Sequence, residues 1–247
     1  MSPTKRLRIF AGPNGSGKST LVKLVENLHV DLGIYINADD IKRTLNSQRY
    51  IDFTFYHLTV DDKHFKNAFE KSSLFIQSDG ETILTGLQFK KNQLHLSNQV
   101  NVNDYFTSFL SSYLRTQLLT TGIKFTFETV MSHPSKIDFI LQAKKQGYRI
   151  YLYFVALDNP ELCVARVEAR VKQDGHDVPP QKVTERYERT MNLLLEAIRI
   201  ADRAYIFDNS YSEPKMFAIA NNKEISIVNT DFAPAWFQKY VIDKLNF

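Results

Sequence analysis

The chain has 247 residues, of which 43% are hydrophobic, 23% charged and 13% aromatic, and its formal net charge is +4. This mild surplus of positive charge does not by itself predict a nucleic-acid binder. No apolar stretch of about 18 residues occurs, so no membrane span is expected. The single cysteine, Cys163, excludes an internal disulfide. A reducing, cytoplasmic location is therefore expected, and the first residues do not resemble a signal peptide.

The first predicted elements flank a glycine-rich segment. An apolar run at residues 7–11 predicts a buried strand, and the apolar spacing after Lys18 predicts a helix. Between them, residues 12–19 fit the phosphate-binding pattern G-x-x-x-x-G-K-[ST] at every fixed position. A strand before the pattern and an amphipathic helix after it favour a phosphate-binding loop over a chance glycine-rich turn.

The pattern also predicts which atoms hold a nucleotide. Glycines let backbone N–H groups curl around phosphate oxygens, and the N-terminus of the next helix adds positive potential. Lys18 is predicted to reach the β- and γ-phosphates of ATP, and the Ser19 hydroxyl to bind Mg²⁺. The predicted nucleotide-binding residues are Gly12, Pro13, Asn14, Gly15, Ser16, Gly17, Lys18, Ser19 and Thr20.

Two acidic positions follow predicted strands. Residues 34–37 form one short strand, followed by Asp39 and Asp40, and residues 124–127 form another, followed by Glu128 and Thr129. In a parallel sheet the carboxyl ends of the strands face the ligand crevice. Asp39 there can accept a proton from a substrate hydroxyl or help hold Mg²⁺, although it also stands where a helix N-cap would stand.

Glu128 has alternatives of its own. It can hydrogen-bond a substrate hydroxyl, act on the metal as a Walker-B-like acid, or be a solvated loop residue. Its place at the end of a buried strand beside a phosphate loop favours the crevice.

The middle of the chain departs from the α/β pattern. Residues 53–72 look helical, whereas residues 73–104 are interpreted as an insertion. Turn signals at residues 78–80 and 91–92 predict a small antiparallel hairpin, with strands at 82–89 and near 94–96. Residues 103–120 then predict a helix with a broad apolar face.

The last part of the chain alternates helices and strands. Gly147 ends a helix at 135–146, and residues 149–157 are apolar enough for a strand covered on both faces. Pro160 opens the next helix, and residues 181–200 predict a long one. Two strands near 204–207 and 224–228 and a C-terminal helix follow, with Trp236 and Cys163 assigned to packing. This alternation implies a parallel sheet covered by helices.

Two pairs of arginines flank a polar loop. Arg166 and Arg170 share one helix face, and Arg186 and Arg189 share a face of the next helix. The loop between them, residues 175–179, would let the segment 166–189 act as a lid that closes over phosphates. The alternative is surface ion pairing with Glu168, Glu185 and Glu188.

These features together resemble the zeta toxin family of P-loop kinases, in particular a branch with a Gly-His-x-Val-Pro lid. The matching segments are GPNGSGKST (12–20), INADDIKR (36–43), FETVMSH (127–133), RVEARVKQDGHDVP (166–179), RYERTMNLL (186–194) and YIFDNS (205–210). Family members phosphorylate a hydroxyl of a nucleotide-sugar, typically UDP-N-acetylglucosamine, and several are toxins held in check by an antitoxin.

The resemblance implies roles for matching residues. Asp39 would be the catalytic base, Glu128 and Thr129 would hold the substrate, and lid arginines would stabilise the transferring phosphate. Arg170 and Arg186 are the expected catalytic arginines, with Arg166 and Arg189 assigned to substrate. The lid and the segment 73–104 differ from the founding toxins, so the acceptor and any antitoxin partner stay open.

We therefore expect a single three-layer α/β P-loop kinase domain over residues 1–247, with a mostly parallel sheet, a helical lid and a small hairpin insertion. The expected reaction moves the γ-phosphoryl group of ATP to a hydroxyl of a small molecule, with Mg²⁺. One alternative is a polynucleotide or nucleoside kinase, recognised by salt-dependent oligonucleotide binding. Another is a non-catalytic ATP-binding module, which would bind ATP without turnover. No nucleic-acid or membrane partner is expected.

Overall fold

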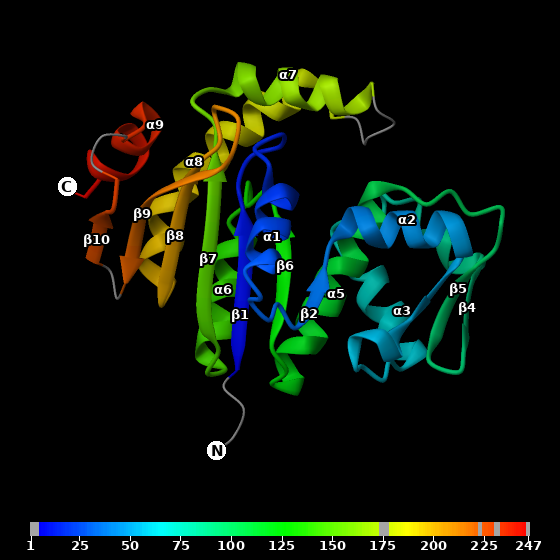
Figure 1. Ribbon diagram of the computed structural model, residues 1–247. Helices are drawn as coiled ribbons and strands as arrows, with labels where there is room; N and C mark the ends of the chain where they lie inside the picture. The colour runs from blue at the N-terminus through cyan, green and yellow to red at the C-terminus, as the bar shows by residue number, and fades with distance from the viewer. Residues whose placement is uncertain (1–4, 173–177, 222–223, 230–232, 246–247) are drawn as a thin grey trace. The chain divides into compact units, whose positions relative to one another are not determined.

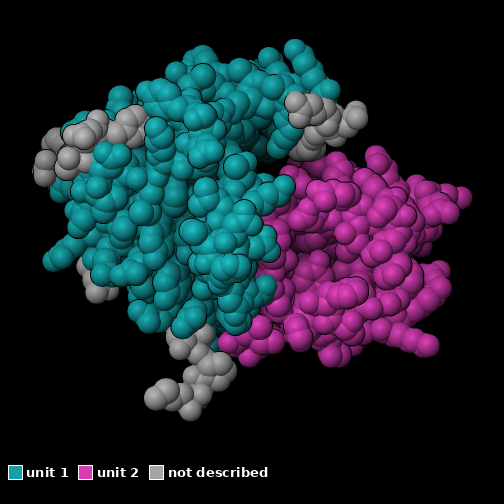
Figure 2. Space-filling view, viewed as in Figure 1, with its two compact units in different colours: residues 1–33, 124–247 teal, residues 34–123 magenta. Residues whose placement is uncertain are grey.

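A computed structural model describes residues 5–172, 178–221, 224–229 and 233–245. The chain divides into two compact units, one formed by residues 1–33 and 124–247 and the other by residues 34–123 (Figure 2). We call them unit 1 and unit 2. Residues 175–177 of the predicted lid loop lie outside the described residues.

Unit 1 is built on a mostly parallel sheet, as predicted (Figure 1). Its strands are hydrogen-bonded in the order β10-β9-β8-β7-β1-β6. The four strands from β6 to β8 in that order are parallel, whereas β9 and β10 run antiparallel at one edge. The bounds are β1 (Arg6–Ala11), β6 (Phe125–Thr129), β7 (Arg149–Ala156), β8 (Arg203–Asp208), β9 (Lys215–Asn221) and β10 (Glu224–Ile227).

Helices cover both faces of this sheet. Helix α1 lies on one face and helices α6 and α8 lie on the other (Figure 1). Helix α7 packs on α8 and lies across the end of the sheet to which the parallel strands point (Figure 1). The bounds are α1 (Lys18–Asn27), α6 (Ser135–Lys145), α7 (Pro160–Val171) and α8 (Pro180–Ile200). The three-layer α/β prediction is confirmed in this unit.

Local sequence signals explain where these helices start and stop. Pro160 occupies the first turn of α7, where its missing N–H costs no hydrogen bond, and the Asn159 side chain caps the same turn. Gly147 follows α6 with a φ of 82°, a conformation that glycine adopts without strain. The Tyr148 N–H then donates to the Ala143 carbonyl, which closes the helix end.

Unit 2 carries the predicted hairpin. Strands β4 and β5 pair antiparallel through a turn at Lys91 and Asn92, both with positive φ, and β3 adds a third strand that the sequence did not predict. Residues 82–85 belong to helix α4 rather than to the hairpin, because Ile83 is buried there and the Gly86 N–H bonds back to Thr82. The elements are β2 (Ile34–Ile36), α2 (Ala38–Gln48), β3 (Tyr50–Asp52), η1 (Phe53–Tyr56), α3 (Asp62–Glu70), α4 (Gly80–Thr85), β4 (Leu87–Lys90), β5 (Gln93–Leu96) and α5 (Asp104–Thr121).

The helix predicted over residues 53–72 is interrupted. The Asn92 side chain donates to the Leu58 carbonyl and accepts from the Val60 N–H, which holds residues 58–60 outside any helix. Asp61 then caps α3 by accepting from the His64 N–H at 2.7 Å. A side chain distant in sequence thus divides one predicted helix into η1 and α3.

The end of the chain differs most from the prediction. Strand β9 was not predicted, and the C-terminal helix is reduced to α9 (Ala235–Phe237) and a π-helical turn η2 (Gln238–Ile242). The packing assignment of Trp236 is confirmed, since its ring contacts Phe154 and Phe217. Its indole N–H also donates to Asp208 Oδ2 at 2.8 Å. Within the described residues, no helix is long and apolar enough to cross a membrane.

The core of unit 2 depends on clustered aromatic rings, which predicts an unequal response to substitution. Phe65 is fully buried against Phe89, Phe109 and Tyr113, whereas Phe55 is 77% exposed. Phe65→Ala should lower the free energy of unfolding by about 3–5 kcal/mol, the usual cost of removing a buried ring. Phe55→Ala is the matched control and should change it by less than about 0.5 kcal/mol. Urea titration measures both, and equal effects would contradict this packing.

Candidate functional site

The phosphate loop connects β1 to α1 in unit 1. Gly12, Gly15 and Gly17 have φ values of 152°, 74° and 96°, which side-chain-bearing residues rarely adopt. Ser16 closes a turn by donating its N–H to the Pro13 carbonyl at 3.3 Å. Within the described part of the chain, the N–H groups of Asn14, Gly15 and Gly17 donate to no protein group. The loop therefore presents several backbone N–H groups that can donate hydrogen bonds to an anion.

Neighbouring segments press against the loop where its glycines lie. A Cβ on Gly12 would stand 2.0 Å from the Val155 carbonyl oxygen, and one on Gly15 would stand 2.6 Å from the Cys163 carbonyl oxygen. Strand β7 and helix α7 thus support the loop at distances that only glycine permits. A side chain at either position would clash with these backbone carbonyls.

Lys18 folds over the loop that precedes it. Its ammonium donates to the carbonyls of Gly12 and Pro13 at 3.0 and 2.9 Å. The positive charge is therefore held at the loop, where it complements the negative charge of a phosphate group. Its predicted contact with the β- and γ-phosphates stays a prediction.

Ser19 and Glu128 meet at the end of the sheet. Strand β6 runs parallel to β1, and its register pairs Glu128 with Phe10, just before the loop. The Ser19 hydroxyl donates to Glu128 Oε2 at 3.1 Å. A hydroxyl and a carboxylate beside a phosphate loop are oxygen donors of the kind that Mg²⁺ prefers. These residues therefore fit a magnesium nucleotide, and the solvated-loop alternative for Glu128 is wrong, since it lies in a strand.

Thr129, a predicted substrate-binding residue, is buried. It is 8% exposed, and its hydroxyl accepts a hydrogen bond from the Met131 N–H at 3.0 Å. Met131 has a φ of 56°, so this bond stabilises a sharp turn after β6. The Thr129 side chain supports the shape of the site's edge, and its contact with a substrate stays a prediction.

Asp39 belongs to unit 2 and does not cap its helix. The N-cap of α2 is Asn37, whose side chain accepts from the Asp39 N–H at 2.9 Å. The Asp39 carboxylate, which lies in the exposed first turn of α2, forms no hydrogen bond or ion pair with any residue that the structure describes. Asp40, in contrast, pairs with Arg43 at 2.8 Å on the same helix. The N-cap expectation for Asp39 is wrong, and its carboxylate is available for another role.

The four lid arginines lie in different surroundings. Arg166 Nη2 donates to the carbonyls of Asn209 and Tyr211 at 2.7 and 3.0 Å, so it is held by the chain after β8. Arg170 is exposed on the last turn of α7. Arg186, half-buried, and Arg189, exposed, lie on α8 and make no ion pair with the described residues. Among the described residues, Arg166, Arg186 and Arg189 form no salt bridge with Glu168, Glu185 or Glu188.

A buried polar turn supports the site; its first residues belong to the matching segment 205–210, for which the sequence predicted no role. Residues 208–211, which we call the Asn209 turn, begin at the last residue of β8 next to the phosphate loop. Asp208 and Asn209 are 1% and 5% exposed, and the Asn209 side-chain amide donates to the Ser16 carbonyl at 2.9 Å. The sequence signals were the polar run Asp-Asn-Ser directly after an apolar stretch and the match of residues 205–210 to the family.

Burial also shapes the ionisation of residues around the loop. Burial raises the pKa of the Cys163 thiol to about 12, so the thiol is protonated at neutral pH and is not a nucleophile. This agrees with its assignment to the core. Burial and the nearby Asp208 raise the pKa of Asp158, which lies just after β7.

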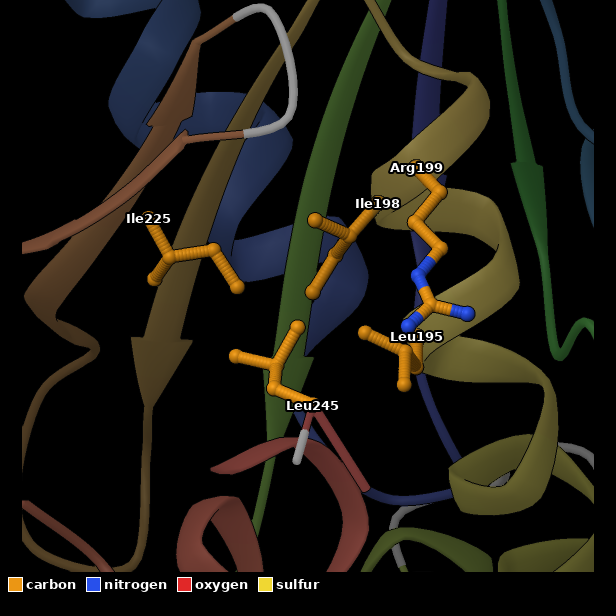
Figure 3. Close-up of a pocket in the computed structure, with 5 residues that line it drawn as sticks. All are labelled: Leu195, Ile198, Arg199, Ile225 and Leu245. Carbon is orange, nitrogen blue, oxygen red and sulfur yellow. The ribbon is translucent and has the colours of Figure 1, made fainter. Parts of the chain in front are cut away.

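A separate pocket lies in unit 1, with a volume of about 280 Å³ (Figure 3). Its lining residues come from α8, β10 and the end of the chain: Leu195, Ile198, Arg199, Ile225 and Leu245. No predicted site residue lines it. The chemistry is therefore assigned to the phosphate loop rather than to this pocket.

Two family models match the chain. The model of the zeta toxin matches residues 89–214, just over half of the chain. The model described as AAA domain, putative AbiEii toxin, Type IV TA system matches residues 9–101, which include the phosphate loop. The first match contains Glu128, the lid helices and the Asn209 turn.

Individual relatives are more distant. An uncharacterized protein of Haemophilus influenzae is 34% identical over 65 residues, which are 26% of this chain and 46% of that protein. The AvrRxo1-ORF1:-ORF2 crystal structure with ATP has a TM-score of 0.56 and 16% identity, covering 97% of this chain and 64% of that one. The structure with sulphate ions has a TM-score of 0.55, 17% identity and the same coverage. These structures share the fold, and the family match shows that this chain belongs to the zeta toxin family.

Proposed function

We propose that the protein is an ATP-dependent kinase that transfers the γ-phosphoryl group to a hydroxyl of a small molecule. The observation that carries this proposal is the arrangement in unit 1 of Lys18, Ser19 and Glu128 around a loop of unpaired backbone N–H groups. Membership of the zeta toxin family supports it, and the AvrRxo1-ORF1:-ORF2 crystal structure with ATP shares the fold.

The loop would bind the phosphates mainly through its backbone. The N–H groups of Asn14, Gly15 and Gly17 need no rearrangement to donate to an anion, because the glycine conformations are already formed. Donors that are oriented before the reaction stabilise developing charge at little cost in reorganisation. Lys18 would exchange the Gly12 and Pro13 carbonyls for phosphate oxygens as ATP binds.

Ser19 and Glu128 would hold Mg²⁺ at the loop. When bound, the metal neutralises charge on the β- and γ-phosphates. Ser19 would contribute its hydroxyl oxygen, and Glu128 would accept from a metal-bound water or from the substrate. Their hydrogen bond orients the hydroxyl before the metal arrives.

Asp39 would be the catalytic base. A base must have a carboxylate that is not already engaged, and the Asn37 cap leaves the Asp39 carboxylate without a structural task. It would take the proton of the acceptor hydroxyl while that oxygen bonds to the γ-phosphorus and ADP leaves. Thr129 and Arg189 would contribute to substrate binding, and the acceptor would be a nucleotide-linked amino sugar such as a UDP-amino sugar.

The lid helices would complete the site. Arg170 and Arg186 lie on α7 and α8 near the two ends of the connecting loop, so closure would bring guanidinium groups to the transferring phosphate. An antitoxin protein is the proposed partner, which family membership supports.

The first prediction tests the reaction itself. The wild-type protein, given γ-labelled ATP, Mg²⁺ and a metabolite extract, should transfer label to a small molecule that mass spectrometry identifies. Lys18→Ala should fold normally and lower the transfer rate by about 10²–10³, because one preorganised charge donor is lost. Label released only as inorganic phosphate, or a folded mutant with wild-type transfer, would contradict the proposal.

The second prediction concerns Asp39. Asp39→Asn should lower the transfer rate about a hundredfold or more while MgATP affinity stays within about twofold, because its partner is the acceptor hydroxyl. The free energy of unfolding should hardly change, since Asn37 caps α2. Asp40→Asn, on the same turn, is the control and should keep its rate. Similar small rate changes in both variants would remove the base assignment.

The third prediction concerns the lid. Arg170→Ala and Arg186→Ala should each lower single-turnover transfer, by about a hundredfold for an arginine that contacts the γ-phosphate. Replacement by lysine should fail at that position, because it loses the planar fork of donors. Arg199→Ala, on the exposed end of α8, should react at the wild-type rate. Unchanged rates in both lid variants would mean that Arg170 and Arg186 are surface residues with no part in phosphoryl transfer.

A further inference from the structure

The Asn209 turn is attached to the rest of unit 1 at unusually many points. The Asn209 N–H donates to the Ala156 carbonyl at the end of β7, and its own carbonyl accepts from Arg166 on α7. Its side-chain amide donates to the Ser16 carbonyl of the phosphate loop. One residue thus joins a strand, a lid helix and the nucleotide loop through its backbone N–H, its carbonyl and its side-chain NH₂ group.

The bond to Ser16 has a consequence for the next N–H along the loop. The Ser16 carbonyl and the Gly17 N–H belong to the same peptide group, which is planar and trans. In a trans peptide these two groups point in opposite directions. Because Asn209 holds the carbonyl on its own side, the Gly17 N–H points away from Asn209, and no described protein group accepts from it.

We propose that Asn209 is a positioning residue that aims the Gly17 N–H at the phosphates of the bound nucleotide. The inference rests on the proposed function, since it assumes that the loop binds a nucleotide. An N–H that is fixed in direction binds an anion better than one that must be reoriented first. Asn209 therefore acts on the nucleotide through the loop rather than by contact with it.

Gly17 and Asn209 fit each other closely. A Cβ on Gly17 would stand 2.3 Å from the Asn209 amide nitrogen, so the space beside Gly17 is filled by this side chain. Gly17 also has a φ of 96°, where any other residue is strained. The glycine is needed at this position both for its conformation and for the approach of Asn209.

Arg166 is assigned the same kind of role. Its Nη2 joins the carbonyls of Asn209 and Tyr211, which fixes the backbone of the turn to α7. The direct contact with substrate expected from the sequence is replaced in this assignment by support of the loop. Arg166 thereby links the start of the lid to the nucleotide site.

The other side of the turn is anchored as firmly. Asp208 accepts from the Trp236 indole N–H at 2.8 Å and from the Ser210 N–H and hydroxyl at 2.9 and 3.0 Å. The Ser210 hydroxyl also accepts from the Asp158 N–H at 2.9 Å. A turn with its buried polar groups satisfied has a single stable geometry, which a positioning element requires.

Isothermal titration of the full chain with MgADP and MgATP tests the proposal. Phosphate-loop N–H groups contact the α- and β-phosphates, which both nucleotides carry. Asn209→Ala should therefore lower the affinity for both nucleotides by the same factor. We expect about tenfold to a hundredfold, the usual effect of one hydrogen bond to a charged group. Arg166→Ala should weaken both by a smaller equal factor, and Arg166→Lys should restore most of the affinity. Asn67→Ala, an exposed position on α3, is the control and should bind like the wild type.

The outcomes separate the two levels of the argument. Wild-type affinity in Asn209→Ala would overturn the positioning role and leave the kinase proposal standing. A wild-type protein that binds neither nucleotide would overturn both. If Asn209→Ala does not fold, the variants of the half-buried Arg166 provide the test. If Arg166→Ala weakens MgATP binding but not MgADP binding, and Arg166→Lys does not restore it, then Arg166 contacts the γ-phosphate directly. That result would overturn the positioning role of the Asn209 turn.

Discussion

A phosphate-binding loop must leave several backbone N–H groups unpaired and pointing to one place, although unpaired polar groups destabilise a folded protein. In this chain the loop at residues 12–19 meets that requirement through glycine conformations and close support from its neighbours. Val155, Cys163 and Asn209 fill the space that a side chain at Gly12, Gly15 or Gly17 would occupy. The arrangement of unit 1 follows from this need, because strands β1, β7 and β8 all end at the loop.

The two compact units have different tasks in the proposed reaction. Unit 1 contains the groups for ATP: the loop, Lys18, Ser19, Glu128 and the lid helices. Unit 2 contains the proposed base, Asp39, on a helix that another residue caps. Such a division lets the nucleotide-binding part stay rigid, while the acceptor-binding part, with its own aromatic core and small sheet, is free to differ between relatives of one fold.

Much of unit 1 was predictable from the sequence because its signals are local. The phosphate loop is a continuous pattern, and the apolar runs of β1 and β7 give buried parallel strands. The N-cap of α2 and the secondary structure of residues 82–85 depended on weaker signals. Asn37 and Asp39 are both good caps, and only the backbone geometry decides between them. Residues 82–85 have strand-forming side chains, but burial of Ile83 favours the helix.

The contacts that support the site could not be predicted in this way. The bond from Asn209 to Ser16 joins residues 193 positions apart, and no periodicity or motif connects them. Likewise, Asn92 interrupts the helix predicted over residues 53–72 from more than thirty positions away. Arg166 has the sequence pattern of a lid arginine, and only the fold shows that its guanidinium is engaged by carbonyls. Long-range side-chain contacts are decided by packing, which a single sequence does not display.

The central claim is that unit 1 is already shaped for the phosphates of ATP and that Lys18 is its movable part. A crystal structure with Mg²⁺ and a non-hydrolysable ATP analogue tests this most directly. We expect the phosphates within the loop, its backbone unchanged, the Asn209 bond to Ser16 retained, and the Lys18 ammonium moved from the Gly12 and Pro13 carbonyls to phosphate oxygens. A nucleotide bound elsewhere, or a loop that must rebuild its backbone to bind it, would contradict the account.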